Sequence, residues 1–278
     1  MQTSQKKDQR LLVQPLARTE ALYATPKKKA RTALKPLTDE WNYIINNLRN
    51  YWSPETICGR WHKEFPDRKT ICVSTVYRYI KLNLFPNITV KRNLRRRGKR
   101  IQTRNANYNS IQPDRIIPEW PDEIRLRTRF GDWEGDTVYG GIGKGLLVTQ
   151  VDRKSRFLRA GLLEKREASL TKEVICRLLK DLPVKSISLD NGSEFAEFHA
   201  IEKELHTEIY FAEPHKPWQR GTNENTNDIL RFFFPKGTNF HQVSDEELQK
   251  VVYLINTRPR KCLGWKSPFE VFWGVALA

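Results

Sequence analysis

The sequence has no long apolar run and few cysteines. None of its 278 residues lie in a stretch approaching the roughly 18 consecutive apolar residues that a membrane-spanning helix needs. Residues 1–10 are polar and lack the apolar run of a secretory signal peptide. The four cysteines are widely scattered without the paired spacing of a structural zinc site, so we expect reduced thiols. These absences predict a cytoplasmic protein with no membrane partner.

Acidic residues are scarce in the front part of the chain but not in the rest. Residues 1–115 hold 25 Lys or Arg against 8 Asp or Glu, whereas residues 116–278 hold 24 of each. The whole net charge of +17 therefore belongs to the front part, which a polyanion partner explains and general solubility does not. Nucleic acid is the natural candidate. A basic tail without a partner would explain residues 27–31 but not the helical patterns between the basic runs.

The chain before residue 86 divides into two parts by pattern. Residues 1–36 lack apolar periodicity and contain three prolines, so we expect an irregular basic arm that orders only on a partner. Three helical patterns follow over residues 37–85. They indicate a helix-turn-helix domain, in which the last helix enters a DNA major groove. Small helical bundles that bind protein have the same pattern, so the helices alone do not identify the partner.

Local signals give bounds for two of these helices. Ser53 followed by Pro54 is typical of an N-cap and a first helical position, and opens a helix that runs to about residue 64. Ser74 can cap a last helix over residues 75–83. The residues of this last helix that we expect to contact DNA are Arg78 and Lys81.

Residues 86–124 form a predicted basic linker. Within it, residues 91–104 contain eight basic residues in fourteen positions and no acid. Such a run can neutralise several phosphates, so DNA binding should weaken steeply with salt. The residues predicted to contact DNA here are Arg95, Arg96, Arg97, Lys99 and Arg100.

Residues 125–278 read as an α/β catalytic core. Strand patterns cover residues 131–139, 145–151, 156–163, 186–190 and 209–212, and helical patterns cover 169–182, 197–205 and a segment containing Glu224. The first three strands are joined by short turns and should pair antiparallel. This order is the layout of a ribonuclease-H-like fold with a mixed sheet.

Three acids on separate elements of this core predict a metal site. Asp190 ends the fourth strand, and Glu224 follows it with 33 residues between them. The third acid comes from the first strand, where alternation puts Asp132, Glu134 and Asp136 on one face, so periodicity alone does not choose among them.

Carboxylates are the ligands that Mg²⁺ prefers. Two Mg²⁺ ions about 3.5 to 4 Å apart, with Mn²⁺ as a possible substitute, can activate a water or a 3′-hydroxyl and stabilise the leaving oxygen of a phosphoryl displacement. We expect Asp136 and Asp190 to hold the metals most directly and Glu224 to complete the second site. No covalent nucleophile is needed.

Two arginines near Glu224 are predicted to contact DNA. Arg220 and Arg231 lie on roughly the same helix face as the glutamate. An alternative for Arg231 is an intrahelical interaction with Asp228 or Asn227.

The motifs of the chain resemble the IS-thirty family of bacterial insertion-sequence transposases, a DDE group whose core is similar to retroviral integrase. The resemblance covers about residues 50–278 and rests on residues 135–136, 151–155, 189–192, 217–225, 234–238 and 256–264, with 53–55, 76–80 and 94–98 also in place. It implies that Asp136, Asp190 and Glu224 are the catalytic triad. It also implies cleavage of double-stranded DNA at the element's ends, followed by strand transfer into target DNA through the freed 3′-hydroxyl.

The pairing of two element ends leads us to expect a homo-oligomer on DNA, associated with the bacterial nucleoid. Such transposases usually carry a further N-terminal helix-turn-helix that reads the terminal inverted repeats. Here the family-like region begins almost at the start, so we expect a shortened copy with its chemistry intact and its end recognition impaired. Asp132 also stands where the family has a histidine.

Two other functions fit the same residues. A DNA-binding regulator would use the basic front part and a core without activity, but all three acids are present, which argues against decay. A ribonuclease-H-like nuclease would hydrolyse nucleic acid without strand transfer. The basic front part of the chain favours duplex DNA as the substrate but does not exclude such a nuclease.

Overall fold

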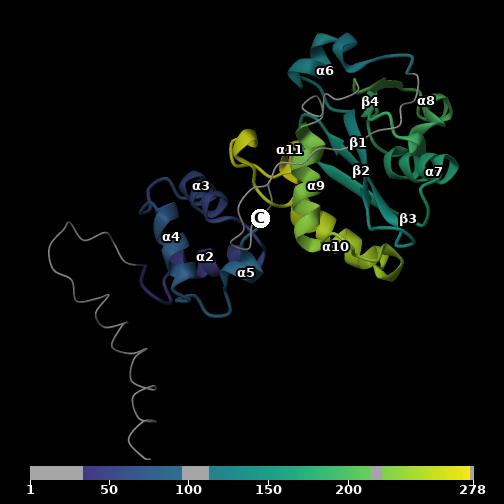
Figure 1. Cartoon of the computed structure of the whole chain (residues 1–278). Helices are drawn as coiled ribbons and strands as arrows, with labels where there is room; N and C mark the ends of the chain where they lie inside the picture. Colours follow the sequence, from purple (N-terminus) through teal and green to yellow (C-terminus); the bar gives the residue numbers. More distant parts are fainter. Residues whose placement is uncertain (1–33, 96–112, 214–220, 276–278) are drawn as a thin grey trace, which may run out of the picture. The chain divides into compact units, whose positions relative to one another are not determined.

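The structure is a computed structural model that describes residues 34–95, 113–213 and 221–275 (Figure 1). The chain forms two compact units, residues 1–42 and 43–278. The finer predicted division into arm, helix-turn-helix domain, linker and core stays a prediction. Over the described ranges, no helix has the length and apolar character needed to cross a membrane.

The first described part of the chain, residues 34–95, is helical. Its helices are α2 (Asp39–Arg49), α3 (Pro54–Glu64), α4 (Val73–Lys81) and α5 (Val90–Asn93). The predicted cap at Ser53 is confirmed, because its Oγ accepts a hydrogen bond from the Thr56 backbone N at 3.3 Å. The predicted cap at Ser74 is wrong: α4 begins at Val73, and the Ser74 hydroxyl lies in its first turn, 2.9 Å from Cys72 Sγ.

Aromatic packing and two buried polar contacts hold these helices together. The ring of Tyr43 on α2 lies 5.0 Å from Trp61 on α3, in an edge-to-face arrangement that aromatic pairs prefer. The indole N–H of Trp61 donates to the Lys69 carbonyl at 3.0 Å, so its one polar atom is satisfied. Asn93 Nδ2 on α5 donates to the Leu48 carbonyl at the end of α2 at 3.1 Å.

The rest of the described chain is built on one five-stranded sheet with the order β3-β2-β1-β4-β5. Its strands are β1 (Asp132–Tyr139), β2 (Leu146–Asp152), β3 (Leu158–Leu163), β4 (Ser186–Leu189) and β5 (Glu208–Phe211). β2 pairs antiparallel with both β1 and β3, whereas β4 pairs parallel with both β1 and β5. The predicted mixed sheet of the ribonuclease-H-like class is confirmed, with strand ends within two residues of their expected positions.

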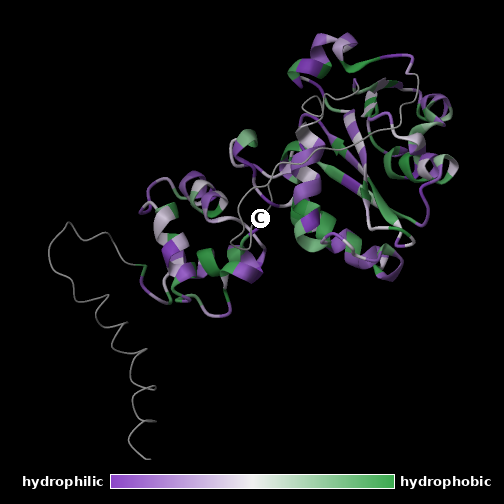
Figure 2. Ribbon diagram, viewed as in Figure 1, coloured by the Kyte–Doolittle hydropathy of each residue, from purple (hydrophilic) through white to green (hydrophobic). Residues whose placement is uncertain are grey.

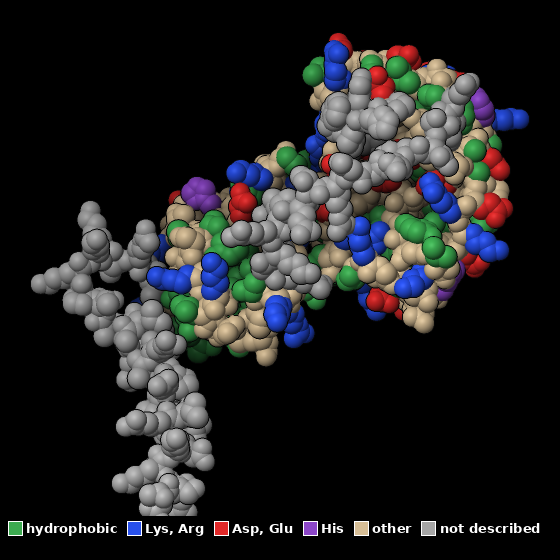
Figure 3. All heavy atoms as spheres, viewed as in Figure 1, with side chains coloured by type: hydrophobic (Ala, Val, Ile, Leu, Met, Phe, Trp, Pro, Cys, Tyr) green, Lys and Arg blue, Asp and Glu red, His purple; other side chains and the backbone are tan. Residues whose placement is uncertain are grey.

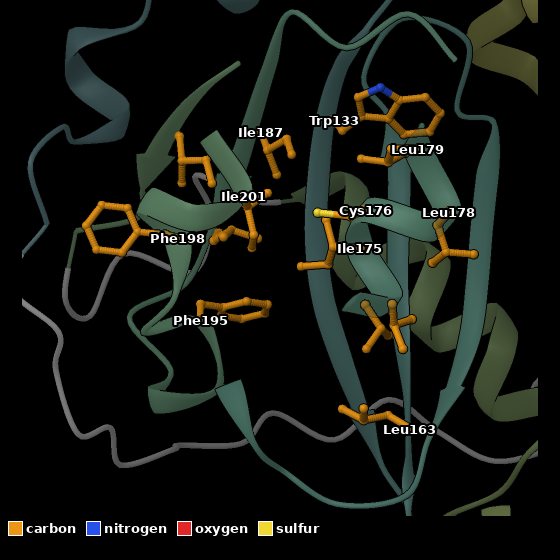
Figure 4. Packing of buried hydrophobic residues seen from close by; sticks show 14 of the residues in the cluster. Trp133, Leu163, Ile175, Cys176, Leu178, Leu179, Ile187, Phe195, Phe198 and Ile201 are labelled. Carbon is orange, nitrogen blue, oxygen red and sulfur yellow. The ribbon is translucent and has the colours of Figure 1, made fainter. Parts of the chain in front are cut away.

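Helices cover both faces of the sheet. The helices of this part are α6 (Asp122–Leu126), α7 (Ala168–Leu179), α8 (Phe198–Leu205), α9 (Gly221–Phe233), α10 (Asp245–Asn256) and α11 (Pro268–Trp273), with short 3₁₀ turns at Ile117–Glu119, Ser193–Phe195, Phe240–Gln242 and Lys261–Leu263. α7 and α8 pack on one face, where Trp133 and Ile187 of the sheet meet Ile175 and Ile201 of the helices (Figure 4).

The other face packs against α9 and α10. Val138 of β1 and Leu147 of β2 lie in one cluster with Ile229 and Leu230 of α9. The hydropathy of α9 changes along its length, from hydrophilic near Gly221 to hydrophobic near its end (Figure 2). Side chains alternate across a strand, so the acids at even positions of β1 share the face of Val138 and point towards α9.

The two predicted hairpin turns are present. After β1, the Gly140 backbone N donates to the Gly145 carbonyl at 3.1 Å, and Gly145 has a positive φ of 65° that favours glycine. After β2, Asp152 Oδ1 accepts from the Ser155 backbone N at 2.7 Å and from its hydroxyl at 2.6 Å. Burial raises the pKa of Asp152, against the lowering effect of these hydrogen bonds. This buried carboxylate fixes the turn that joins β2 to β3.

Candidate active site

The pairing of β1 with β4 brings two of the predicted acids together. The parallel register aligns Trp133 with Ile187 and Glu134 with Ser188. Two residues further along each strand come Asp136 and Asp190, the latter directly after the end of β4. In a parallel pair with this register, both side chains lie on the same face, the one covered by α9. Both acids are partly buried.

Helix α9 carries the third predicted acid to the same end of the sheet. The Asn223 backbone N donates to Glu134 Oε2 at 3.2 Å, and Asn227 Nδ2 donates to Asp136 Oδ2 at 2.7 Å. Glu224 lies between these two contacts on the exposed flank of the first turn. It is therefore next to the Asp136 end of β1, about one helical turn before Asn227.

The other two acids on the same face of β1 are fully buried and internally paired. Asp132 accepts a hydrogen bond from Ser186 Oγ at 2.8 Å and pairs with Arg129 at 3.1 Å. Glu134 forms an ion pair with Arg153 and also accepts the Asn223 backbone N. Asp136 is the most accessible of the three acids, because Asp132 and Glu134 are fully buried whereas Asp136 is only partly buried.

Arg153 is itself held on several sides. Its guanidinium carbon lies 3.9 Å from the centre of the Trp120 ring, and its Nε donates to the Ile124 carbonyl at 3.3 Å. Burial lowers the pKa of Arg153, although Glu134 acts in the opposite direction. The Glu134–Arg153 pair is therefore a structural element that ties β1 to the segment around α6.

Glu194, a buried carboxylate beside the site, is not among the acids predicted from the sequence. Only 3% of its side chain is exposed, and it accepts from Thr137 Oγ1 at 3.0 Å. A Cβ added at Gly192 would lie 2.3 Å from Glu194 Oε2 and 2.9 Å from Asp190 Oδ1, so the two carboxylates flank the same glycine. The available signal was an acid four positions after Asp190, in the turn that follows β4.

Glu194 holds a cation at the edge of the site. It pairs with Arg166 at 2.5 Å, while 54% of the Arg166 side chain remains exposed. The hydrogen bond that Arg166 donates to Glu194 is the main cause that raises the pKa of Arg166, and the charge of Asp190 contributes to the increase. A permanent positive charge thus lies close to the predicted metal ligands.

The donor chemistry of the site suits a hard divalent cation. Asp136, Asp190, Glu224 and Glu194 offer carboxylate oxygens, which Mg²⁺ prefers over nitrogen or sulfur ligands. Among the described residues, no three His, Cys, Asp or Glu side chains are grouped tightly enough to hold a metal ion together.

The predicted DNA contacts fall into three groups. Five of them, Arg96, Arg97, Lys99, Arg100 and Arg220, lie outside the described residues. Arg78 and Lys81 are exposed on α4. Figure 3 shows Lys and Arg side chains distributed over much of the visible surface.

Arg95 and Arg231 both contact other parts of the protein. Arg95 pairs with Asp228 of α9 at 2.9 Å. Arg231 Nη2 donates to the Tyr139 carbonyl at 2.7 Å. The alternative prediction for Arg231, an interaction with Asp228 or Asn227 on its own helix, is wrong, because those two side chains bind Arg95 and Asp136 instead.

Comparison with known proteins identifies similar sequences. No protein-family model matches the chain. It is 36% identical over 236 residues to the transposase for insertion sequence element IS4351 of Bacteroides fragilis, covering 82% of this chain and 71% of that protein. It is 34% identical over 248 residues to the transposase InsI for insertion sequence element IS30A of Escherichia coli (strain K12), covering 84% and 64%.

A solved structure also resembles part of the chain. The simian T-cell lymphotropic virus intasome in complex with PP2A regulatory subunit B56 gamma contains a chain that matches with a TM-score of 0.43 and 21% sequence identity. The match covers 53% of this chain and 55% of that one.

Proposed function

Because the chain belongs to the IS-thirty family of insertion-sequence transposases, we propose that Asp136, Asp190 and Glu224 are the carboxylates with which it cuts and joins DNA. The observation that supports this most strongly is the β1–β4 register, which aligns the first two acids on the face covered by α9. The full burial and internal pairing of Asp132 and Glu134 support the choice of Asp136 among the three acids of β1.

The three carboxylates would hold two Mg²⁺ ions, or Mn²⁺ in their place, and the bound ions would lower the pKa of the attacking hydroxyl and stabilise the leaving oxygen. Asp136 is oriented for this role by Asn227 and by the Thr137 backbone N, which donates to Asp136 Oδ1 at 2.8 Å. Such fixed hydrogen bonds to a ligating carboxylate set the direction of its lone pairs.

The reaction consists of two phosphoryl transfers at one site. In the first, the oxygen of a water attacks a phosphodiester at the element's end, the P–O3′ bond breaks, and a free 3′-hydroxyl remains. In the second, that 3′-oxygen attacks a phosphodiester of target DNA, loses its proton, and displaces the target's own 3′-oxygen. Both ends of an element must be joined, so the working species is a homo-oligomer on double-stranded DNA.

The basic residues bring duplex DNA to this site. Arg78 and Lys81 on α4 are exposed and available to phosphates. The run from Arg95 to Arg100 adds several positive charges close to it in the chain. Neutralisation of phosphates by these residues releases counterions, so binding should weaken steeply as salt is raised.

The experiment that tests the function uses the full chain, Mg²⁺, a pre-cleaved element end and a supercoiled target plasmid. Joined products support the proposal. Hydrolysis of the DNA without joining would instead identify a nuclease, and binding without any reaction would identify a regulator. Omission of the divalent metal should prevent both joining and hydrolysis while leaving the protein folded.

A further inference from the structure

Three arginines line a small cavity at the start of α9. The cavity has a volume of about 160 Å³, and Arg127, Arg156 and Arg260 contribute to its wall together with Gly221 and Thr222. This volume is several times the roughly 30 Å³ that one water molecule occupies in the liquid, so it has room for a phosphate group. The three arginines come from separate parts of the chain, and the fold brings them together.

The guanidinium groups are only partly satisfied by the protein. Arg156 Nη1 donates to Thr222 Oγ1 at 2.9 Å, and Arg127 Nη1 donates to the Arg153 carbonyl at 3.3 Å. Arg260 Nε is buried and has no hydrogen-bond partner within the described part of the chain. A buried donor without an acceptor costs free energy, which an anion in the cavity would recover.

Charge around the cavity is unbalanced. No carboxylate of the described residues forms an ion pair with any of the three arginines. Burial, together with repulsion by Arg258 and Arg95, lowers the pKa of Arg260 to about 10, and burial with repulsion by Arg95 lowers that of Arg258 to about 10.

The local backbone holds the cavity in place. Arg156 has a positive φ of 66°, a conformation that non-glycine residues adopt only where the surroundings fix it. The Asp152–Ser155 turn directly before it provides that support. The N-terminal end of the 13-residue helix α9 adds its partial positive charge to the same wall.

We propose that this arginine cavity, formed by Arg127, Arg156 and Arg260, binds a backbone phosphate of the DNA strand that enters the active site. The inference rests on the proposed function. The cavity begins at Gly221, three positions before Glu224, so a phosphate held there fixes the strand beside the first turn that carries this acid. The cavity thereby sets the position of the strand relative to the metal ligands.

The first test measures anion binding without any reaction. The melting temperature of the full chain is followed as inorganic phosphate is added, with chloride at matched ionic strength as the reference. We expect phosphate to raise it by roughly 2–4 °C. Arg260→Gln should lose this rise without a lower melting temperature in chloride, because the substitution also removes repulsion between arginines. Arg177→Gln on the opposite face of the sheet is the matched control and should keep the rise.

The second test measures the contact with DNA. A fluorescein-labelled duplex ending in the pre-cleaved element end is titrated with protein at several salt concentrations. Loss of one phosphate contact should reduce the slope of log affinity against log salt by about 1 in Arg260→Gln and Arg156→Gln, and not in Arg177→Gln. Arg260→Lys keeps the positive charge and should therefore restore most of the slope, because the slope reflects the number of phosphates that cations neutralise.

Two results would overturn the proposal: an equal phosphate-induced rise in the wild type and Arg260→Gln, or unchanged salt slopes in both cavity variants. If Arg260→Gln fails to fold, Arg156→Gln and Arg260→Lys decide the outcome. Joining of the pre-cleaved end by the wild type is scored separately. If the wild type joins DNA but the cavity variants keep the phosphate-induced rise or the salt slopes, only this inference is rejected. If the wild type binds phosphate through the cavity but joins no DNA, the proposed function is rejected.

Discussion

One face of the sheet holds acids in two different environments. At its closed end, defined here by Asp132 and Glu134, the carboxylates are fully buried and each is paired with an arginine. At its open end, defined by Asp136 and Asp190, the carboxylates are partly exposed, and they accept hydrogen bonds from the Asn227 side-chain amide and from backbone N–H groups. All four acids lie on one face of the sheet, so burial and partners distinguish the acids held inside the fold from those that we propose as metal ligands.

The two ends of this face differ in how the negative charge of their carboxylates is balanced. A buried carboxylate without a cation would be destabilised by several kcal/mol, so the closed end requires its arginines. The acids of the open end are only partly buried, so a divalent cation could approach them from solvent. Substitutions at the open end should therefore mainly reduce activity, whereas substitutions at the closed end should mainly reduce the free energy of unfolding.

The largest expected effect is on activity at the open end. Asp190→Asn should abolish both hydrolysis and joining, because the amide cannot supply a carboxylate to a metal ion. The free energy of unfolding should change by less than about 1 kcal/mol, since the side chain is partly exposed. Joining assays and urea unfolding measure the two quantities, and DNA binding should be retained. Residual turnover in this variant would contradict the assignment.

A large effect on stability is expected at the closed end. Glu134→Gln leaves the buried Arg153 without its counter-charge and should lower the free energy of unfolding by about 3–5 kcal/mol. Urea unfolding provides the measurement, with the exposed Glu173→Gln as a control that should change by less than about 0.5 kcal/mol. Equal stability of the two variants would mean that the ion pair is not a structural requirement.

An intermediate effect is expected for Glu194, which has features of both ends. It is buried and paired with an arginine like the acids of the closed end, yet it flanks Gly192 together with Asp190. Glu194→Gln should reduce the joining rate about 10- to 100-fold by loosening Arg166 and Thr137, and should raise the Mg²⁺ concentration needed for half-maximal rate. The exposed Glu197→Gln is the control. An unchanged Mg²⁺ requirement would assign Glu194 a purely structural role.

The smallest expected effect concerns pH and a buried acid outside the sheet. Glu270 on α11 pairs with Arg60 on α3 at 2.9 Å. Although burial acts in the opposite direction, hydrogen bonds from Arg60 and Ser267 hold the pKa of Glu270 below its usual value. A depressed pKa stabilises the fold above the unfolded pKa of about 4.3 and loses this contribution as pH falls through the folded pKa.

Glu270→Gln should therefore remove part of the acid-induced loss of stability, on the order of 1 kcal/mol between about pH 5 and pH 3. Urea unfolding of both proteins across this range gives the difference curve, and the exposed Glu246→Gln serves as the control. Parallel curves for the wild type and Glu270→Gln would show that the Arg60–Glu270 pair makes no pH-dependent contribution to the free energy of unfolding.

The strands and the order of the acids were predictable because they depend on local signals. Hydrophobic periodicity located β1 to β5, and the short turns fixed the antiparallel pairing of the first three. The Asp190 position followed from its place at a strand end. The choice among Asp132, Glu134 and Asp136 did not follow from periodicity, because it depends on Arg129 and Arg153, whose contacts form only in the folded chain.

Contacts between distant segments account for what the sequence did not reveal. Glu194 joins the site through Thr137, 57 positions earlier in the chain. The arginine cavity combines Arg127, Arg156 and Arg260 with the start of α9, and no local pattern links them. The misplaced cap at Ser74 has a different cause, since α4 begins one residue earlier at Val73 without any side-chain cap.

The two outer strands of the sheet are covered by groups other than strands. On β3, Asn256 of α10 accepts from the Leu158 backbone N at 2.8 Å and donates to its carbonyl at 2.9 Å, as a neighbouring strand would. Gln249 donates to the Ala160 carbonyl at 3.2 Å. On β5, Phe211 forms an isolated bridge with Ile116. Exposed strand edges are templates for aggregation, and these contacts block that route. If copies of the chain assemble on one DNA molecule, as we propose, these contacts oppose edge-to-edge pairing of their sheets.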